Sequence, residues 1–201
     1  MGSPRLIMKM KVVQIRDEPG DVRVFILRHP RRTVLPEFSA GSHVDVHLPD
    51  GRVRQYSLFG DPRDRSQYSI AVKREAGGRG GSGCLHDNVA AGHELPVSAP
   101  RNHFGLSAEA GSHILMAGGI GITPMLAMAR TLDAAGGDFA LHYFARSRSL
   151  APLLAEIAQN LPAQRVICTS TTSLQRTLIS PLSFLSSLAM PISITADRPG
   201  S

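Results

Sequence analysis

The sequence contains no tryptophan and only two cysteines, Cys84 and Cys168, among its 201 residues. Two thiols so far apart in sequence cannot supply the four ligands of an iron–sulfur cluster or of a four-thiolate zinc site. We therefore expect no metal site and no iron–sulfur cluster in this chain, and any such cluster must belong to another protein.

Long hydrophobic runs are also missing. No stretch approaches the roughly 18 uncharged apolar residues that span a bilayer. Arg5, Lys9 and Lys11 interrupt the first 13 residues before a signal-peptide core could form. We expect a cytoplasmic protein that binds no membrane.

Aromatic residues make up only 5% of the chain, which leaves few platforms for stacking nucleic-acid bases. The 22 Lys and Arg residues exceed the 16 Asp and Glu residues, so the net charge is +6 and favours an anionic partner. Charge alone does not choose among a nucleotide, a nucleic acid and an acidic protein, but the basic residues are mostly scattered singly, which argues against nucleic acid. A hydrophobic content of 42% suffices for one large core or two small ones.

The first half predicts an antiparallel barrel, which we place at residues 1–107. Short runs of strand-forming residues alternate with turn residues, and one helical turn is expected at 84–90. The six predicted strands are 6–15, 22–28, 43–48, 52–58, 67–73 and 94–98.

The next segment predicts a partial parallel α/β unit, which we place at residues 108–165. Apolar runs at 113–117 and 139–145 are each followed by a helical pattern, at 124–135 and 151–161. This β-α-β-α alternation is typical of nucleotide-binding sheets.

Composition changes abruptly at residue 166. Residues 166–201 contain thirteen Ser or Thr and three charged residues, whereas the 165 residues before them carry 35 charges. Prolines at 181, 191 and 199 interrupt any helix. We expect an atypical tail with no further β-α unit.

Three segments carry candidate chemistry. In Arg54-Gln55-Tyr56-Ser57, strand geometry puts Arg54 and Tyr56 on one face and Ser57 on the other. Alone, this segment also fits an ordinary surface strand.

The glycine-rich run 77–83 lets several backbone N–H groups converge on an anion, and Arg79 and Ser82 suit a phosphate. The alternative is a flexible linker.

The third segment is Gly118-Gly119-Ile120-Gly121, which follows a strand and precedes a helix. Thr123 suits the N-cap of that helix, and Pro124 suits its first position. Unpaired N–H groups at such a helix start bind pyrophosphate, although the G-x-G-x-x-G fingerprint is absent and a tight turn alone would also fit.

Five motifs in order resemble the ferredoxin–NADP reductase superfamily, most closely its phthalate dioxygenase reductase and vanillate demethylase reductase branch. The resemblance covers residues 5–165 approximately. The motifs are RQYS at 54–57, AVKRE at 71–75, GRGGS at 78–82, PRNHF at 100–104 and GGIGITP at 118–124.

This resemblance implies a flavin site. Arg54 would pair with the flavin phosphate, Tyr56 would pack on the isoalloxazine ring, and Ser57 would hydrogen-bond near its N5 atom. Lys73 would lie beside the flavin. The phosphate would be enclosed by Gly80, Gly81 and Ser82. FMN is favoured over FAD, because no candidate for an adenine-stacking aromatic is evident.

The resemblance also implies a site for a nicotinamide dinucleotide, which would bring its C4 hydride over the flavin N5. Arg146 and Ser147 would meet the adenosine ribose. NADH is expected, and NADPH stays open because arginines also accept a 2′-phosphate. The loop and helix residues that would receive the dinucleotide are Gly118, Gly119, Gly121 and Thr123.

The implied function is a flavin-dependent NAD(P)H oxidoreductase. It would be the reductase component of an aromatic-ring oxygenase or demethylase, passing single electrons to an iron–sulfur acceptor. No catalytic acid or base is expected, since the cofactors exchange the hydride themselves. Ser57 and Thr123 would lie nearest the reacting atoms. The alternative is a flavin-binding remnant without productive NADH oxidation.

The family's Cys-Gly-Pro segment and cluster cysteines do not occur in this sequence. We hypothesise that the reading frame shifted, or the gene was cut, near residue 165. Translating the coding DNA in the other two frames tests this, and absence of both motifs there would contradict it.

Overall fold

The computed structural model describes residues 6–170. Its first part is an antiparallel sheet with the strand order β4-β3-β6-β1-β2-β5, and a bridge between Leu58 and Ile70 links its two ends. The two-residue strand β7 (Arg101–Asn102) pairs with β3. The six longer strands are β1 (Ile7–Glu18), β2 (Val22–Arg28), β3 (Ser42–His47), β4 (Val53–Ser57), β5 (Tyr68–Lys73) and β6 (Glu94–Ser98).

Alternation of side chains explains this barrel. In β1, Met8, Met10 and Val12 are buried while Lys9 and Lys11 face outward, as a strand with one apolar face requires. The six-stranded antiparallel fold predicted from the sequence is confirmed. β7 was not predicted, because two residues are too short to show a period.

The second part is a parallel sheet with the order β10-β9-β8. Its strands are β8 (Ser112–Gly118), β9 (Asp138–Ala145) and β10 (Val166–Ser170). Its connections contain α2 (Ile122–Ala134) and α3 (Leu154–Asn160). The predicted α/β alternation is confirmed.

No strand is predicted after residue 165, and the structure differs there. β10 begins at Val166 and pairs with β9 over five residues, from Val166 opposite Leu141 to Ser170 opposite Ala145. Serine and threonine in this strand do not prevent backbone pairing with a neighbouring strand. The rest of the expected tail, 171–201, lies outside the described residues.

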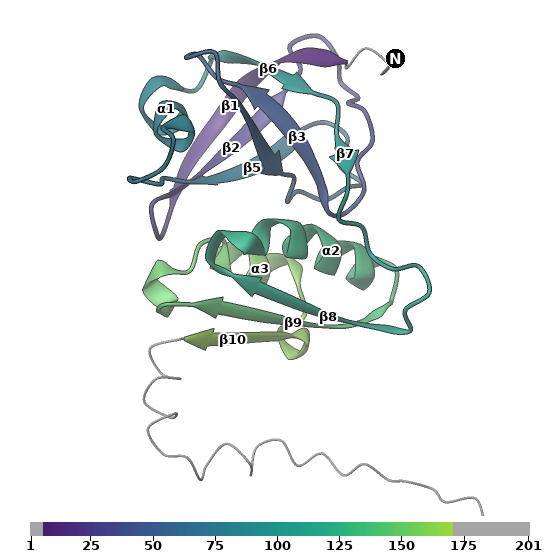
Figure 1. Cartoon of the computed structure of the whole chain (residues 1–201). Helices are drawn as coiled ribbons and strands as arrows, with labels where there is room; N and C mark the ends of the chain where they lie inside the picture. Colours follow the sequence, from purple (N-terminus) through teal and green to yellow (C-terminus); the bar gives the residue numbers. More distant parts are fainter. Residues whose placement is uncertain (1–5, 171–201) are drawn as a thin grey trace, which may run out of the picture.

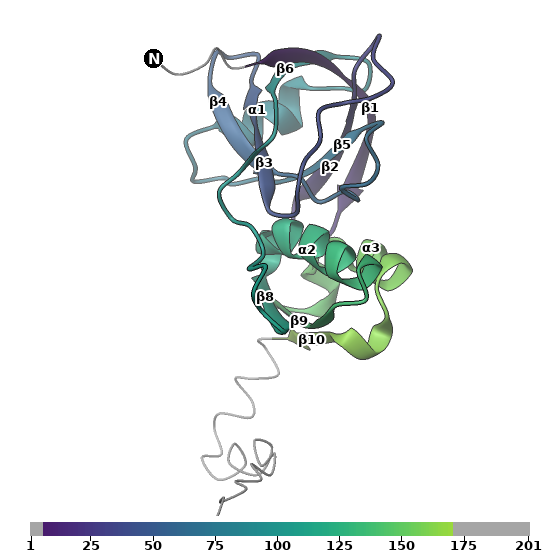
Figure 2. The ribbon, with the colours of Figure 1, turned by 90° about the vertical axis from the view of Figure 1, so that its right-hand side faces the viewer.

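Helices α2 and α3 lie between the barrel and the parallel sheet (Figures 1 and 2). A single hydrophobic cluster joins these layers, with Val22, Val24 and Phe59 from the barrel and Leu126 from α2 among its members. The two sheets therefore share a continuous apolar contact.

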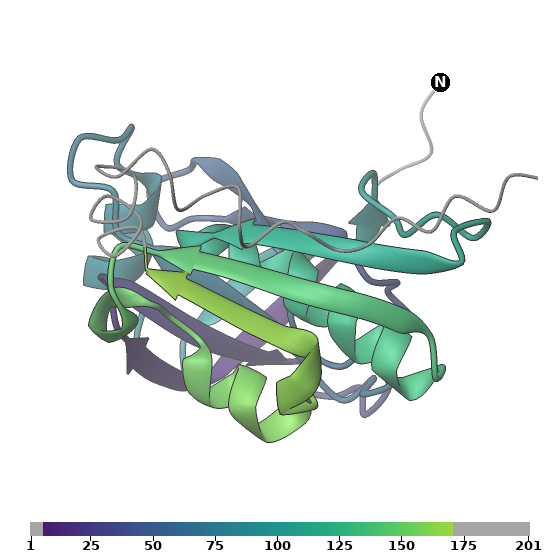
Figure 3. The same ribbon diagram turned by 90° about the horizontal axis from the view of Figure 1, so that it is seen from below.

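The opposite face of the parallel sheet is not covered by any helix of residues 6–170, as the view onto that face shows (Figure 3). Ile114 and Met116 of β8 point there and are 72% and 63% exposed. Within the same range, no helix combines the length and hydropathy needed to cross a membrane.

Candidate functional site

The first candidate cavity, about 490 Å³, lies where the barrel meets the start of α2. Eight of the predicted site residues line it. They are Arg54, Tyr56, Ser57, Lys73, Gly81, Ser82, Gly121 and Thr123.

A neighbouring cavity of about 620 Å³ extends toward the carboxyl end of β9. Its lining includes Gly118, Gly119 and Arg146, three of the residues expected to meet a dinucleotide. Lys73 and Ile120 line both cavities, so the two spaces meet at these residues.

Strand β4 presents its side chains to the smaller cavity. Tyr56 is half-buried against the barrel core, and this burial raises its pKa to about 12, so the ring stays uncharged at neutral pH. Ser57 lines the cavity too, although strand alternation placed it on the other face. β4 lies at the end of the strand order, so residues from both of its faces can border the space.

The glycine run continues into helix α1 (Gly81–Asn88), which begins three residues earlier than expected. Gly80 has a φ of 77° and precedes the helix, a conformation that favours glycine. A Cβ on Gly81 would lie 2.7 Å from Arg54 Nε. The missing side chain thus lets Arg54 lie across the helix start, where N–H groups attract anions.

Ser82 connects this helix start to the strand β5 side of the cavity. Its hydroxyl oxygen accepts a hydrogen bond of 3.0 Å from the Glu75 N–H. Glu75 also pairs with the Lys73 ammonium at 3.0 Å. These contacts hold the glycine-rich loop beside Lys73, while Gly80 supports the helix start without lining either cavity.

The start of α2 differs from the prediction. The helix begins at Ile122, because the 3₁₀ turn Gly119–Gly121 runs directly into it. Thr123 is therefore inside the helix, and its hydroxyl donates back to the Ile120 carbonyl at 3.1 Å. The predicted N-cap role of Thr123 and first-position role of Pro124 are wrong.

The glycines of this turn leave open space where a nucleotide would approach. A Cβ added at Gly118, Gly119 or Gly121 would meet no protein atom within 4 Å. Within residues 6–170, the turn thus leaves room for a ligand to approach its backbone closely.

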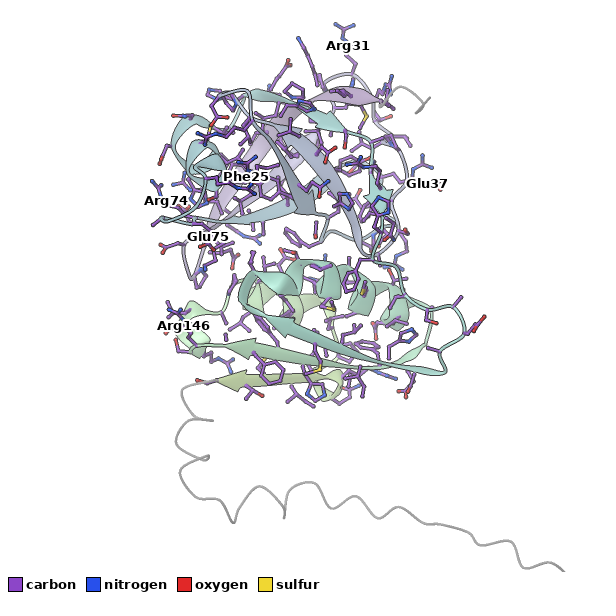
Figure 4. The ribbon with its side chains drawn as sticks, viewed as in Figure 1. Phe25, Arg31, Glu37, Arg74, Glu75 and Arg146 are labelled. Carbon is purple, nitrogen blue, oxygen red and sulfur yellow. The ribbon has the colours of Figure 1, made fainter. Side chains whose placement is uncertain are left out.

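At the other end of the larger cavity, Arg146 follows β9. Lys73, Arg74 and Arg146 together make this lining basic, and Arg74, Glu75 and Arg146 lie on the same side of the molecule (Figure 4). Ser147 instead lines a third space of about 130 Å³ beside Arg148. The predicted pair Arg146 and Ser147 thus borders two adjoining cavities.

Sequence reasoning missed part of this lining. Gly20, Asp21 and Val22, in and after the β1–β2 turn, border the larger cavity. They lie about 100 residues from the glycine turn in sequence, so no local pattern could have connected them. Ile120 was quoted within the motif without a role, and it lines both cavities.

No group of three or more His, Cys, Asp or Glu side chains in residues 6–170 is arranged to hold a metal ion.

Comparison with known proteins agrees with this geometry. Residues 9–105 match the family described as the oxidoreductase FAD-binding domain. The phenoxybenzoate dioxygenase subunit beta of Ectopseudomonas oleovorans is 48% identical over 75% of this chain and 47% of its own length. The vanillate O-demethylase oxidoreductase of Pseudomonas putida is 49% identical over 71% of this chain and 45% of its own.

A solved structure extends the likeness to the fold. Phthalate dioxygenase reductase, described as a modular structure for electron transfer from pyridine nucleotides to [2Fe-2S], superposes with a TM-score of 0.78 at 39% identity. The match covers 82% of this chain and 51% of that one. The chain thus spans about half the length of the relatives it matches.

Proposed function

We propose that this chain, a homologue of phthalate dioxygenase reductase that carries an oxidoreductase FAD-binding domain, transfers a hydride from NADH to bound FMN. In this proposal residues 1–107 bind the flavin and residues 108–165 bind the dinucleotide. An iron–sulfur or oxygenase protein would be the partner that accepts the electrons, one at a time.

The observation that carries the proposal is the junction of the two cavities. A phosphate-suited cavity and a glycine-lined cavity share Lys73 and Ile120. Hydride transfer needs two cofactors held with their reacting rings in contact, because proximity and orientation lower the barrier. Adjoining cavities supply that arrangement.

Each residue then has a binding or positioning role. Arg54 and Ser82 hold the flavin phosphate at the start of α1, and the uncharged Tyr56 ring packs on the isoalloxazine. Ser57 donates a hydrogen bond near the flavin N5. Bound FMN supplies the redox chemistry, since its ring accepts a hydride and releases electrons one at a time.

The dinucleotide is held by the second cavity. Backbone N–H groups of Gly119–Gly121, the 3₁₀ turn that runs into α2, bind its pyrophosphate, because the start of a helical segment carries unpaired donors and a partial positive charge. Arg146 and Ser147 contact the ribose, and Thr123 lies nearest the nicotinamide. No side chain has to move a proton in the transfer itself.

The cavity lining supports FMN rather than FAD as the flavin. Tyr56 is the one aromatic among the described residues that line the smaller cavity. An FAD adenine gains affinity from a second aromatic surface. Without that surface, the FAD adenine would gain no stacking contact in this cavity, which favours FMN.

An electron-transfer assay tests this function. With NADH as donor and ferricyanide as acceptor, the purified chain is expected to turn over only when flavin is added, with half-maximal rate at a lower concentration of FMN than of FAD. NADPH is assayed in parallel and is expected to be the poorer donor. A rate no higher than that of free FMN with NADH would contradict the proposal and would leave a flavin-binding remnant as the alternative.

A further inference from the structure

A network of charged side chains crosses the contact between the barrel and the helical layer. It does not include Lys73 or Ile120, the two residues that line both cavities. Its centre is Arg16 on β1. The Nε of Arg16 donates to Glu18 Oε1 at 2.9 Å, and its Nη2 donates to Glu156 Oε1 of α3 at 2.8 Å. One arginine thus connects a barrel strand with a helix of the nucleotide half.

A second arginine also links the two halves, this time from the nucleotide half to the barrel. The Nη2 of Arg130 on α2 donates to Glu156 Oε2 at 2.8 Å, and its Nη1 donates to the Phe59 carbonyl at 2.9 Å. Its side chain is only 10% exposed. Glu156 is therefore held by two arginines, one from each half of the molecule.

Glu18 makes a further link. Its Oε2 accepts a hydrogen bond of 3.0 Å from the Leu153 N–H. Leu153 is fully buried and has a φ of 62°, in the left-handed region that is uncommon for leucine. The surrounding contacts, Glu18 among them, keep this backbone in place.

The end of the same hairpin also approaches the nucleotide half closely. A Cβ on Gly20, whose φ is 76°, would lie 2.7 Å from the Leu150 carbonyl oxygen. The β1–β2 hairpin thus contacts the chain at Leu150, Leu153 and Glu156.

This contacted segment directly follows Arg146 and Ser147, the residues at the adenosine end of the proposed nucleotide site. Asp21 from the hairpin and Leu150 from the segment line the same 620 Å³ cavity. A shift of the hairpin against the segment would therefore change the shape of the nucleotide cavity and its junction with the flavin cavity.

Charge-assisted hydrogen bonds hold the hairpin and the contacted segment in a fixed relative position better than apolar packing does. The hydrophobic contact between the halves is non-directional, whereas charge-assisted hydrogen bonds fix geometry. Burial alone would raise the pKa of Glu156, but hydrogen bonds from Arg16 and Arg130 outweigh it and lower the pKa. The Glu156 carboxylate is thus ionised at neutral pH.

We propose that Arg16, Glu18, Arg130 and Glu156 are positioning residues that fix the nucleotide half on the flavin half. Their effect on reaction rate rests on the proposed function, whereas their effect on the relative orientation of the halves does not. They touch neither proposed cofactor and act through the alignment of the two cavities.

The test compares Glu156→Gln with a matched control, Glu37→Gln. Gln keeps the size of the side chain and removes its charge. Glu37 also pairs with an arginine, Arg65 at 2.7 Å, but both residues belong to the barrel (Glu37 is labelled in Figure 4). Residual dipolar couplings of backbone amides are measured in the presence of FMN, and hydride transfer is followed at saturating NADH.

We expect the wild type and Glu37→Gln to fit one alignment tensor for both halves, and Glu156→Gln to require two. Hydride transfer in Glu156→Gln is expected to slow about tenfold at saturating NADH, since small misplacements of reacting groups are costly, while FMN affinity stays unchanged. Slower hydride transfer with unchanged FMN affinity distinguishes a positioning role from a general loss of stability.

A single tensor for Glu156→Gln, with both halves folded, would overturn the proposal. Two tensors together with a wild type that does not reduce flavin would support the positioning role and contradict the proposed function. If Glu156→Gln does not fold, Glu18→Gln takes its place, because glutamine has one acceptor oxygen and cannot accept from both the Leu153 N–H and Arg16. One tensor in that variant would equally overturn the proposal.

Discussion

Replacing Arg54 by alanine is expected to weaken FMN binding roughly 10- to 100-fold. A charge-assisted hydrogen bond to an anion contributes about 1.5–3 kcal/mol, and about 1.4 kcal/mol corresponds to a factor of ten. Arg54 lies across Gly81 at the start of α1, where the phosphate is proposed to bind. Titration of FMN by fluorescence quenching measures the change.

Arg63→Ala is the matched control for this variant. Arg63 is an exposed barrel arginine that pairs with Asp61 at 2.7 Å and lines neither proposed cavity. Its replacement is expected to leave the FMN dissociation constant unchanged. An equal loss in both variants would indicate a general charge effect and would contradict the assigned role of Arg54.

The second large effect is expected from Gly118→Leu. Gly118 lines the 620 Å³ cavity, its φ of −119° suits any residue, and an added Cβ would meet no protein atom within 4 Å. The leucine side chain would occupy space proposed for the dinucleotide without straining the backbone. We expect NADH-dependent flavin reduction to fall about 100-fold, because excluding the hydride donor removes the advantage of proximity.

FMN affinity and thermal stability should stay the same in Gly118→Leu, since the flavin cavity does not include this residue. Gly111→Leu serves as its control, because Gly111 also has open space around it and lies before β8, outside both cavities. Rapid-mixing absorbance measurements follow the reduction. An undiminished rate in Gly118→Leu would place the dinucleotide elsewhere.

Local sequence patterns predicted most of the fold. Alternation in β1 and the continuous apolar runs at β8 and β9 showed the strands, since each period depends only on neighbouring residues. The Ser/Thr-rich composition after residue 165 concealed β10. Val166–Ser170 forms a strand by pairing with β9, which a local pattern does not show.

The candidate site was predicted where a motif is contiguous. Gly81 and Ser82 lie together in sequence and in space, beside Arg54. The helix start at Thr123 was predicted wrongly, because a 3₁₀ turn merging into a helix looks in sequence like a loop followed by a capping residue.

Contacts over long sequence distances could not be predicted. Arg16 and Glu156 are 140 positions apart and meet only once both halves have folded. Gly20 and Asp21 of the β1–β2 hairpin likewise line the larger cavity only once both halves have folded. A single sequence carries no signal for such pairs.

The measurement that tests the central claim most directly is the visible absorption spectrum of the FMN-loaded chain, mixed with NADH in the absence of oxygen. With the two cofactors aligned in adjoining cavities, the flavin band is expected to bleach within seconds and to return when ferricyanide is added. A chain that binds FMN but keeps its oxidised spectrum, or one that binds no flavin, would contradict the proposed hydride transfer.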